Sequence, residues 1–167
     1  MKRILASILT TLLIIAMTLV AMYVLVEATL KAAGCGTTAK GVSKIGGQRL
    51  RSRDGHDLGD VDAIGANLAS KILILAEAKD FEMARNPAEL ANEAEDLLKG
   101  NKSALFKLSR RAQWVRDHLA LTLSYLHIDG RSDGWAVAPV IVTSRDLISP
   151  RVLASDIPVV PIETLET

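Results

Sequence analysis

Apolar side chains gather in two short segments near the middle of the chain, separated by a polar turn. Residues 59–64 and 71–79 are rich in apolar and β-branched side chains, and residues 67–70 between them have the composition of a turn. The pattern predicts a β-hairpin. Its second strand is apolar on both faces until its end, where Glu77 and Lys79 share one face because side chains alternate along a strand. Such a strand belongs at the centre of a sheet.

Two helices are predicted after this hairpin. Residues 88–99 form the first, with Asn86 as its cap and Glu89 three positions later in a capping box. In residues 103–126, leucine, alanine and valine recur every three or four positions, which predicts one long helix. The apolar stripe is the face through which this helix would pack on the core.

The remaining segments predict a loop and two more strands. Residues 37–57 are rich in Gly, Ser, Lys and Arg, and we predict a loop there with one strand at most, over residues 44–51. Residues 136–143 predict a buried strand in which Pro139 indicates an edge position or a bulge. Residues 157–162 predict a last short strand. Strands on both sides of two helices indicate a domain of the α/β class.

The start of the chain differs from the rest. Residues 4–26 carry no charged side chain, and a run of this length is what a helix needs to span a bilayer. We therefore expect a single-pass anchor over residues 1–26 and a folded domain over residues 27–167, with the flanking positive charges slightly favouring a cytoplasmic domain. The alternatives are a buried helix of a soluble protein and a lipoprotein signal ending before Cys35. Charged residues between the apolar run and this cysteine argue against the second alternative.

Overall composition restricts the partners of the domain. The 167 residues suffice for one domain, and 20 Lys and Arg against 19 Asp and Glu leave a net charge of +1. Attraction to nucleic acid must then come from a local basic patch. One cysteine excludes an internal disulfide bond. An aromatic content of 4% argues against a base-stacking platform for single strands.

Candidate chemistry lies at the polar end of the predicted hairpin. Asp62 is on the first strand, and Glu77 and Lys79 end the second. Two carboxylates on paired strands can share a divalent ion, because Mg²⁺ is usually held through hard oxygen ligands. A lysine beside them can orient or deprotonate a water molecule, or stabilise a pentavalent phosphate.

The pattern Asp62-(x)n-Glu77-Ala78-Lys79 resembles the PD-(D/E)xK nuclease superfamily, including its nuclease-related-domain-like members. The resemblance implies a restriction-endonuclease-like fold, with a mixed central sheet flanked by helices after the transmembrane helix. It implies that Asp62 and Glu77 hold Mg²⁺ or Mn²⁺, that the Ala78 carbonyl is a further ligand, and that Lys79 is the catalytic lysine.

The resemblance also suggests two accessory residues. Glu27 precedes the first core strand, where related nucleases often carry an acid that assists the metal site. Gln113 matches loosely a Gln or Lys on the helix after the Glu-x-Lys motif. An interfacial carboxylate is the alternative for Glu27. Candidate phosphate contacts lie in two basic regions, one in an alternating segment before the hairpin and one on the outer side of the long helix. For both regions the alternative is a solvated surface. The candidates are Arg49, Arg51, Lys107, Arg110 and Arg111.

These observations lead to one expected function and two alternatives. We expect a membrane-anchored, metal-dependent nuclease that hydrolyses phosphodiester bonds of nucleic acid, with DNA as the expected substrate and a homodimer as one arrangement for cutting a duplex. The first alternative is a catalytically inactive module of the same fold that binds DNA or a protein partner at the membrane. The second is a small membrane protein whose soluble part assembles with other subunits.

Overall fold

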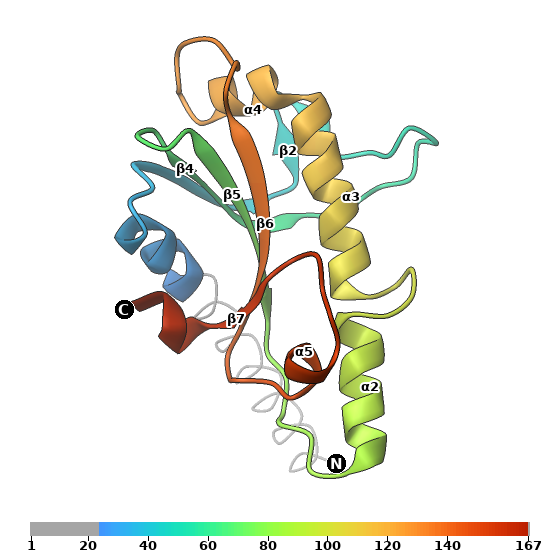
Figure 1. Cartoon of the computed structure of the whole chain (residues 1–167). Coiled ribbons are helices and arrows are strands. Elements are labelled where there is room, and N and C mark those ends of the chain that lie inside the picture. Colours follow the sequence, from blue (N-terminus) through green and yellow to red (C-terminus); the bar gives the residue numbers. More distant parts are fainter. Residues whose placement is uncertain (1–23, 167) are drawn as a thin grey trace, which may run out of the picture.

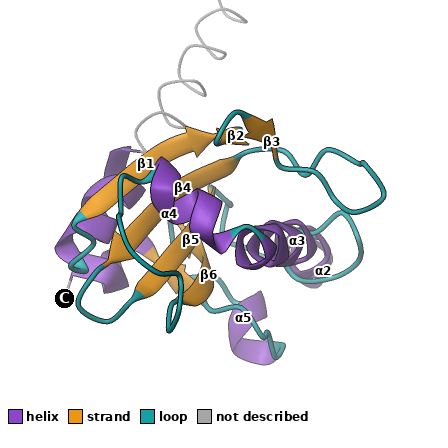
Figure 2. Ribbon diagram, turned by 90° about the horizontal axis from the view of Figure 1, so that it is seen from above, coloured by secondary structure: helices purple, strands orange, loops and turns teal. Residues whose placement is uncertain are grey.

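The computed structural model describes residues 24–166 of the chain, and the side chains of residues 24–164. A five-stranded mixed sheet with the order β1-β4-β5-β6-β7 lies at its centre (Figure 1). Helix α3 covers one face of the sheet, here called the α3 face, and α2 lies beside α3 and α5 near the end of the strands. Helix 24–32 and the 3₁₀ helix η1 cover the other face of the sheet, the N-terminal face (Figures 1 and 2). The predicted α/β class and the mixed sheet flanked by helices are confirmed.

Five strands form the main sheet, and two shorter strands form a separate small hairpin. Their bounds are β1 Thr37–Val42, β2 Lys44–Ile45, β3 Gln48–Arg49, β4 Val61–Asn67, β5 Ile72–Lys79, β6 Ala136–Thr143 and β7 Val159–Pro161. The helices that follow helix 24–32 are α2 Pro87–Leu97, α3 Ala104–Asp117, α4 Leu119–Tyr125, α5 Ser149–Val152 and η1 Ile162–Glu166.

The predicted hairpin is formed by β4 and β5. The two strands run antiparallel, with Ile64 opposite Leu75 and Ala63 opposite Ala76. On its other side β5 pairs in parallel with β6 along its whole length. The strand therefore has neighbours on both sides, as its two apolar faces predict.

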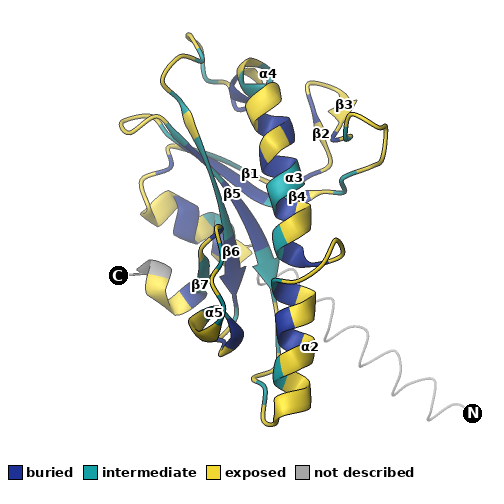
Figure 3. Cartoon of the chain, turned by 45° about the vertical axis from the view of Figure 1, so that its right-hand side comes forward, coloured by how far each residue is buried: buried dark blue, intermediate teal, exposed yellow. Residues whose placement is uncertain are grey.

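The two faces of this hairpin enter two different core clusters. Leu73 and Leu75 pack in the larger cluster on the α3 face, together with Leu108 and Val115 of α3. Ala76 packs in the smaller cluster on the N-terminal face, with residues of helix 24–32 and η1. Glu77 is two residues after Leu75, so its side chain points to the α3 face. Helix α3 turns its buried side to the sheet and its exposed side to solvent (Figure 3).

The first predicted helix is confirmed with its cap. The Asn86 side chain accepts a hydrogen bond from the Glu89 backbone N–H at 3.0 Å, and Pro87 is the first residue of α2. The predicted single helix over residues 103–126 is wrong, because His118 divides it into α3 and α4. The backbone of His118 leaves the helical region (φ −122°, ψ 35°), and its ring stacks on Trp114 at 4.1 Å. Apolar spacing continues across this break, so periodicity alone did not reveal it.

The segment predicted as a loop contains the edge strand β1. This strand pairs antiparallel with β4, with Lys40 opposite Ala63. The sequence of β1 is polar and contains a glycine, so the pairing with β4, rather than an intrinsic strand preference, makes this segment a strand. The strand predicted over residues 44–51 is instead the small hairpin of β2 and β3. Gly46 and Gly47 divide it, with φ of +57° and +80°.

Pro139 marks a partial edge of the sheet. It lies in β6 opposite Leu75 of β5, and a proline has no N–H for a strand on its other side. The last strand, β7, pairs with β6 only from Ile141 to Thr143. Pro139 therefore lies where β6 has one neighbour, which agrees with the edge position that its presence indicated.

Most of the predicted anchor, through residue 23, lies outside the described residues. Val24 and Leu25 are exposed at the start of helix 24–32, whereas Val26 and Leu30 are buried against the sheet. Within residues 24–166, no helix is long and apolar enough to cross a membrane.

Candidate active site

The structure brings together the three residues of the predicted catalytic motif. Asp62 in β4 and Glu77 in β5 lie beyond the pair of Ala63 and Ala76, on the α3 face of adjacent strands. Asp62 Oδ2 accepts a hydrogen bond from the Ala78 backbone N–H at 2.8 Å. Lys79 Nζ lies 3.0 Å from Glu77 Oε1. Residues that are far apart in the sequence thus meet at the end of one strand.

Glu77 is a buried carboxylate between two cations. The residue is only 3% exposed. Lys79 contacts its Oε1, and Arg111 Nη1 donates a hydrogen bond to its Oε2 at 2.5 Å. A buried charge is costly unless it is paired and hydrogen-bonded. The two cations therefore offset the cost of burying this carboxylate.

Arg111 is itself fixed by the loop before β4. Its Nε donates to the Leu58 carbonyl oxygen at 2.7 Å, and the residue is 7% exposed. Gly59 has φ +71°, and a Cβ built there would lie 2.9 Å from Arg111 Nη2. A glycine at this position thus suits both the left-handed backbone and the close approach of the guanidinium.

The prediction that Arg111 lies on the outer basic face of the helix is wrong. Arg111 points inward, between Leu108 and Val115 of the buried stripe. The sequence does indicate the buried position of Arg111, because positions 104, 108, 111 and 115 follow helical spacing and therefore share one face. A positive charge within such a stripe indicates a buried partner, which here is Glu77.

The oxygen donors at this end of the sheet are of the chemical type that hard divalent cations bind, although both carboxylate oxygens of Glu77 contact cations. Asp62 and Glu77 offer carboxylate oxygens from adjacent strands, and Ala78 between Glu77 and Lys79 offers a backbone carbonyl. Mg²⁺ is commonly bound by one or two carboxylates, with water and substrate phosphates as its other ligands. Among residues 24–164 there is no group of three or more His, Cys, Asp or Glu side chains placed to hold a metal ion. The protein would therefore supply two side-chain ligands at most.

The structure does not bring Glu27 to this cluster. Glu27 contacts Lys31 at 3.1 Å and Lys40 at 3.3 Å, and it accepts a hydrogen bond from Thr38 Oγ1 at 3.0 Å. The hydrogen bond from Lys31, followed by the one from Thr38, holds the pKa of Glu27 below its ordinary value. Lys40 is opposite Ala63, so these contacts lie on the N-terminal face. The predicted accessory role has no geometric support because the sheet separates Glu27 from Glu77.

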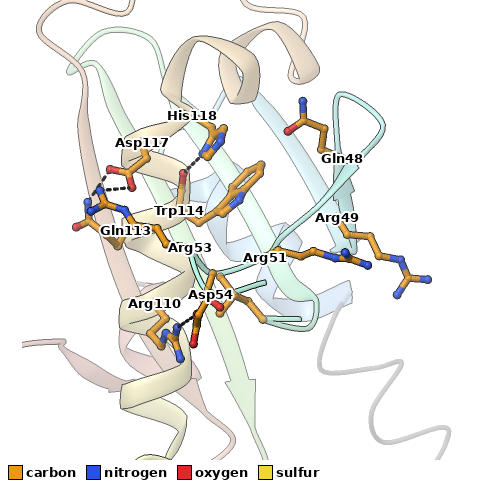
Figure 4. Close-up of a pocket in the computed structure, with 12 residues that line it drawn as sticks. Gln48, Arg49, Arg51, Arg53, Asp54, Arg110, Gln113, Trp114, Asp117 and His118 are labelled. Atoms are coloured by element: carbon orange, nitrogen blue, oxygen red, sulfur yellow. Dashed lines mark hydrogen bonds and ion pairs between the residues drawn. The ribbon is translucent and has the colours of Figure 1, made fainter. Parts of the chain in front are cut away.

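Gln113 also lies away from Glu77. Its Nε2 donates to Asp117 Oδ1 at 2.8 Å on the exposed side of α3 (Figure 4). Two residues along a helix are separated by about 200° around its axis, so Gln113 cannot share the inward direction of Arg111. Arg111 occupies the inward helix position that was expected for Gln113.

A basic cleft of about 1110 Å³ opens between α3 and the segment that contains β3 (Figure 4). We call it the arginine cleft and define it by Gln48, Arg49, Arg51, Arg53, Arg110 and Trp114. Three of its arginines contact aspartates, in the pairs Arg49–Asp57, Arg53–Asp117 and Arg110–Asp54. The cleft is lined by an excess of positive charge, although much of that charge is locally balanced.

A smaller hollow adjoins the arginine cleft and has Arg111 in its wall. It has a volume of about 390 Å³ and is lined by Gly59, Phe106, Lys107, Arg110 and Arg111, among others. Leu58 and Arg110 line both spaces. All five predicted phosphate contacts therefore line the two adjoining hollows, with Arg111 in a nearly buried position.

Comparisons with models of protein families, with characterised proteins and with solved structures each found no match to this chain. The resemblance to the PD-(D/E)xK superfamily therefore stays a prediction that rests on the chain's own residues and on their arrangement.

Proposed function

We propose that the folded part of this chain is a restriction-endonuclease-like nuclease domain that hydrolyses phosphodiester bonds of DNA with the help of Mg²⁺ or Mn²⁺. One observation carries the proposal. Asp62, Glu77 and Lys79 lie on one face of a β-hairpin whose second strand is central in a mixed sheet, with Lys79 Nζ 3.0 Å from Glu77 Oε1. The proximity of two carboxylates and a lysine supports the proposal.

Each residue of the cluster has a role in this proposal. Asp62 and Glu77 hold the metal ion, with the Ala78 carbonyl as a further ligand. When bound, such an ion stabilises charge on a phosphoryl oxygen and lowers the pKa of a bound water molecule. Lys79 orients or deprotonates the attacking water, and its side chain is 35% exposed and thus accessible from solvent. The buried environment strengthens all of these electrostatic interactions.

The arginine cleft and the adjoining hollow provide the phosphate contacts in this proposal. Arg49, Arg51, Lys107 and Arg110 line these two hollows, and Arg111 in the wall of the smaller one contacts Glu77. Side chains of this type neutralise phosphates without reading the bases, so they would position a strand rather than select a sequence. We further propose that the apolar segment before helix 24–32 anchors the domain at the cytoplasmic side of a membrane, and that two copies together cut a duplex.

A second candidate function is a DNA-binding module without catalysis. The contacts of Glu77 favour it, because both carboxylate oxygens are already occupied by Lys79 and Arg111. A site that has lost its metal ion and kept its fold would retain such a charge pair. This module would still use the arginine cleft.

A cleavage assay with the full chain distinguishes the two functions. We expect the chain to cut plasmid or linear DNA with Mg²⁺ or Mn²⁺ and to lose this activity in EDTA. The Lys79→Ala variant should lose about 10²–10⁴-fold in rate, the range typical of a proton-transfer group. Lys71→Ala is the matched control, because Lys71 precedes the same strand at its other end and contacts the Asp133 carbonyl. Equal metal-dependent cleavage by both variants would exclude the proposed role of Lys79. DNA binding without cleavage would favour the inactive module.

A further inference from the structure

The carboxylate of Glu77 has two cationic partners of very different mobility. The Lys79 side chain is 35% exposed, and the contact with Glu77 is its one ion pair within the described residues. Arg111 is almost completely buried and is held by the Leu58 carbonyl as well as by Glu77. Gly59 packs against its guanidinium. Lys79 can therefore move away at low cost, whereas Arg111 stays close to Glu77.

The local charges explain why this difference matters for metal binding. Asp62 and Glu77 carry two negative charges, and Lys79 and Arg111 carry two positive ones. A divalent ion adds two further positive charges at a site that is largely closed to water, where like charges repel strongly. Binding becomes favourable when one cation leaves Glu77 or when an anion enters with the metal ion.

We propose that Arg111 is a built-in counter-ion of Glu77 that competes with a divalent metal ion for this carboxylate, and that a substrate phosphate relieves the competition. The inference rests on the proposed function, which puts the metal ion between Asp62 and Glu77. Arg111 lines the hollow that also contains Lys107 and Arg110. A phosphate in this hollow balances the charge of the guanidinium, so that Arg111 repels the metal ion less while it stays close to Glu77. Arg111 thus acts as a positioning residue that links metal binding to the presence of DNA.

Calorimetric titration with MnCl₂ tests the competition without any cleavage. The full chain is purified in detergent and freed of metal ions, and no nucleic acid is present. We expect Arg111→Gln to bind Mn²⁺ about tenfold more tightly than the unchanged chain, within the range of ordinary coupling between sites. Arg116→Gln is the matched control on the same helix, because Arg116 donates to the Val137 carbonyl and does not contact Glu77; its affinity should not change. Equal or weaker Mn²⁺ binding by folded Arg111→Gln would overturn the inference.

A second titration keeps the test decisive if Arg111→Gln does not fold. The unchanged chain is titrated with Mn²⁺ in the presence of a phosphorothioate duplex, which resists hydrolysis, and of a methylphosphonate duplex with the same bases and no backbone charge. We expect the chain to bind Mn²⁺ about tenfold more tightly with the phosphorothioate duplex, and with unchanged affinity with the methylphosphonate duplex. The same affinity with both duplexes would contradict the relief of competition by phosphate.

The position of the bound ion is checked with Glu77→Gln, which should abolish the Mn²⁺ heat. A heat that persists in this variant would place the ion elsewhere and overturn the inference. DNA cleavage, which is measured in a separate assay, tests the proposed function. Tighter binding by Arg111→Gln in a chain that does not cut DNA supports the competition and rejects the nuclease. Cleavage by a chain in which Arg111→Gln has no effect on Mn²⁺ binding rejects the competition alone.

Discussion

Two carboxylates on opposite faces of the sheet each contact two cationic side chains, yet their surroundings differ. Glu77 on the α3 face is 3% exposed and lies 2.5 Å from Arg111 and 3.0 Å from Lys79. The Glu27 side chain on the N-terminal face is 20% exposed and lies 3.1 and 3.3 Å from two lysines whose side chains are more than half exposed. The same pairing of charges therefore occurs once in the core and once at the surface.

The comparison teaches that the environment of an ion pair decides its role. Water competes for the partners of Glu27, so this group contributes little more than a tether between helix 24–32 and β1. Glu77 and its partner Arg111 are shielded from water, so removing either of them leaves a buried charge without its partner. Catalytic groups are commonly found in surroundings of the second kind.

The largest expected effect comes from removing Glu77 itself. Glu77→Ala leaves Arg111 as a buried, uncompensated charge, and we expect the free energy of unfolding to fall by about 3–5 kcal/mol. Glu27→Ala, the matched change on the N-terminal face, should cost about 1 kcal/mol or less. Urea denaturation followed by circular dichroism measures both values. Equal losses in the two variants would show that the α3 face gives Glu77 no special environment.

The next effect concerns the glycine that supports Arg111. Gly59→Ala places a Cβ against the guanidinium and forces alanine into φ +71°, so we expect a loss of about 2–3 kcal/mol in the free energy of unfolding. Gly47→Ala is a matched control, since Gly47 has φ +80° and nothing lies within 4 Å of a Cβ built there. The control should lose only the cost of placing alanine in the left-handed backbone conformation, about 1–2 kcal/mol. If both variants lose the same amount in urea denaturation, the contact with Arg111 contributes nothing to stability.

The sequence predicted those parts of the structure whose sequence pattern involves only neighbouring residues. The β4–β5 hairpin and the Asn86 cap were predicted correctly because alternation and capping act over a few residues. The edge strand β1 was not predicted, since its polar residues become a strand only by pairing with β4. The break at His118 was missed because apolar spacing continues across it.

The site residues were also predicted correctly only where a local sequence pattern positions them. The motif residues Asp62, Glu77 and Lys79 lie in strand segments that the alternation pattern positions, and the structure brings them together. Glu27 and Gln113 were assigned by their order along the chain, which does not fix the face on which a side chain lies. Arg111 was assigned to the surface by its charge, although its helical spacing placed it in the core stripe.

A third prediction asks which face of the sheet meets nucleic acid. Arg110 lines both hollows on the α3 face, whereas Lys31 is an exposed cation on the N-terminal face. We expect Arg110→Gln to weaken DNA binding several-fold and to reduce the slope of log K against log salt by about 0.9, the loss of one phosphate contact on a duplex. Lys31→Gln should leave both quantities unchanged. Fluorescence anisotropy across a salt series provides the measurement, in EDTA so that no cleavage occurs. An equal loss in the two variants would indicate non-directional attraction rather than a binding face.

The smallest effect is the pH dependence of the Glu27 tether. Hydrogen bonds from Lys31 and Thr38 lower the pKa of Glu27 from its ordinary value of 4.5 in the folded chain. A carboxyl group with a lowered folded-state pKa stabilises the fold above the unfolded-state pKa, and this contribution disappears as the pH falls through the folded-state pKa. Glu27→Gln should therefore lower the free energy of unfolding by at most about 1 kcal/mol near pH 7 and by almost nothing near pH 3. Urea denaturation at the two pH values measures the difference. A deficit that persists at pH 3 would mean that the tether acts through packing of helix 24–32 rather than through the charge of Glu27.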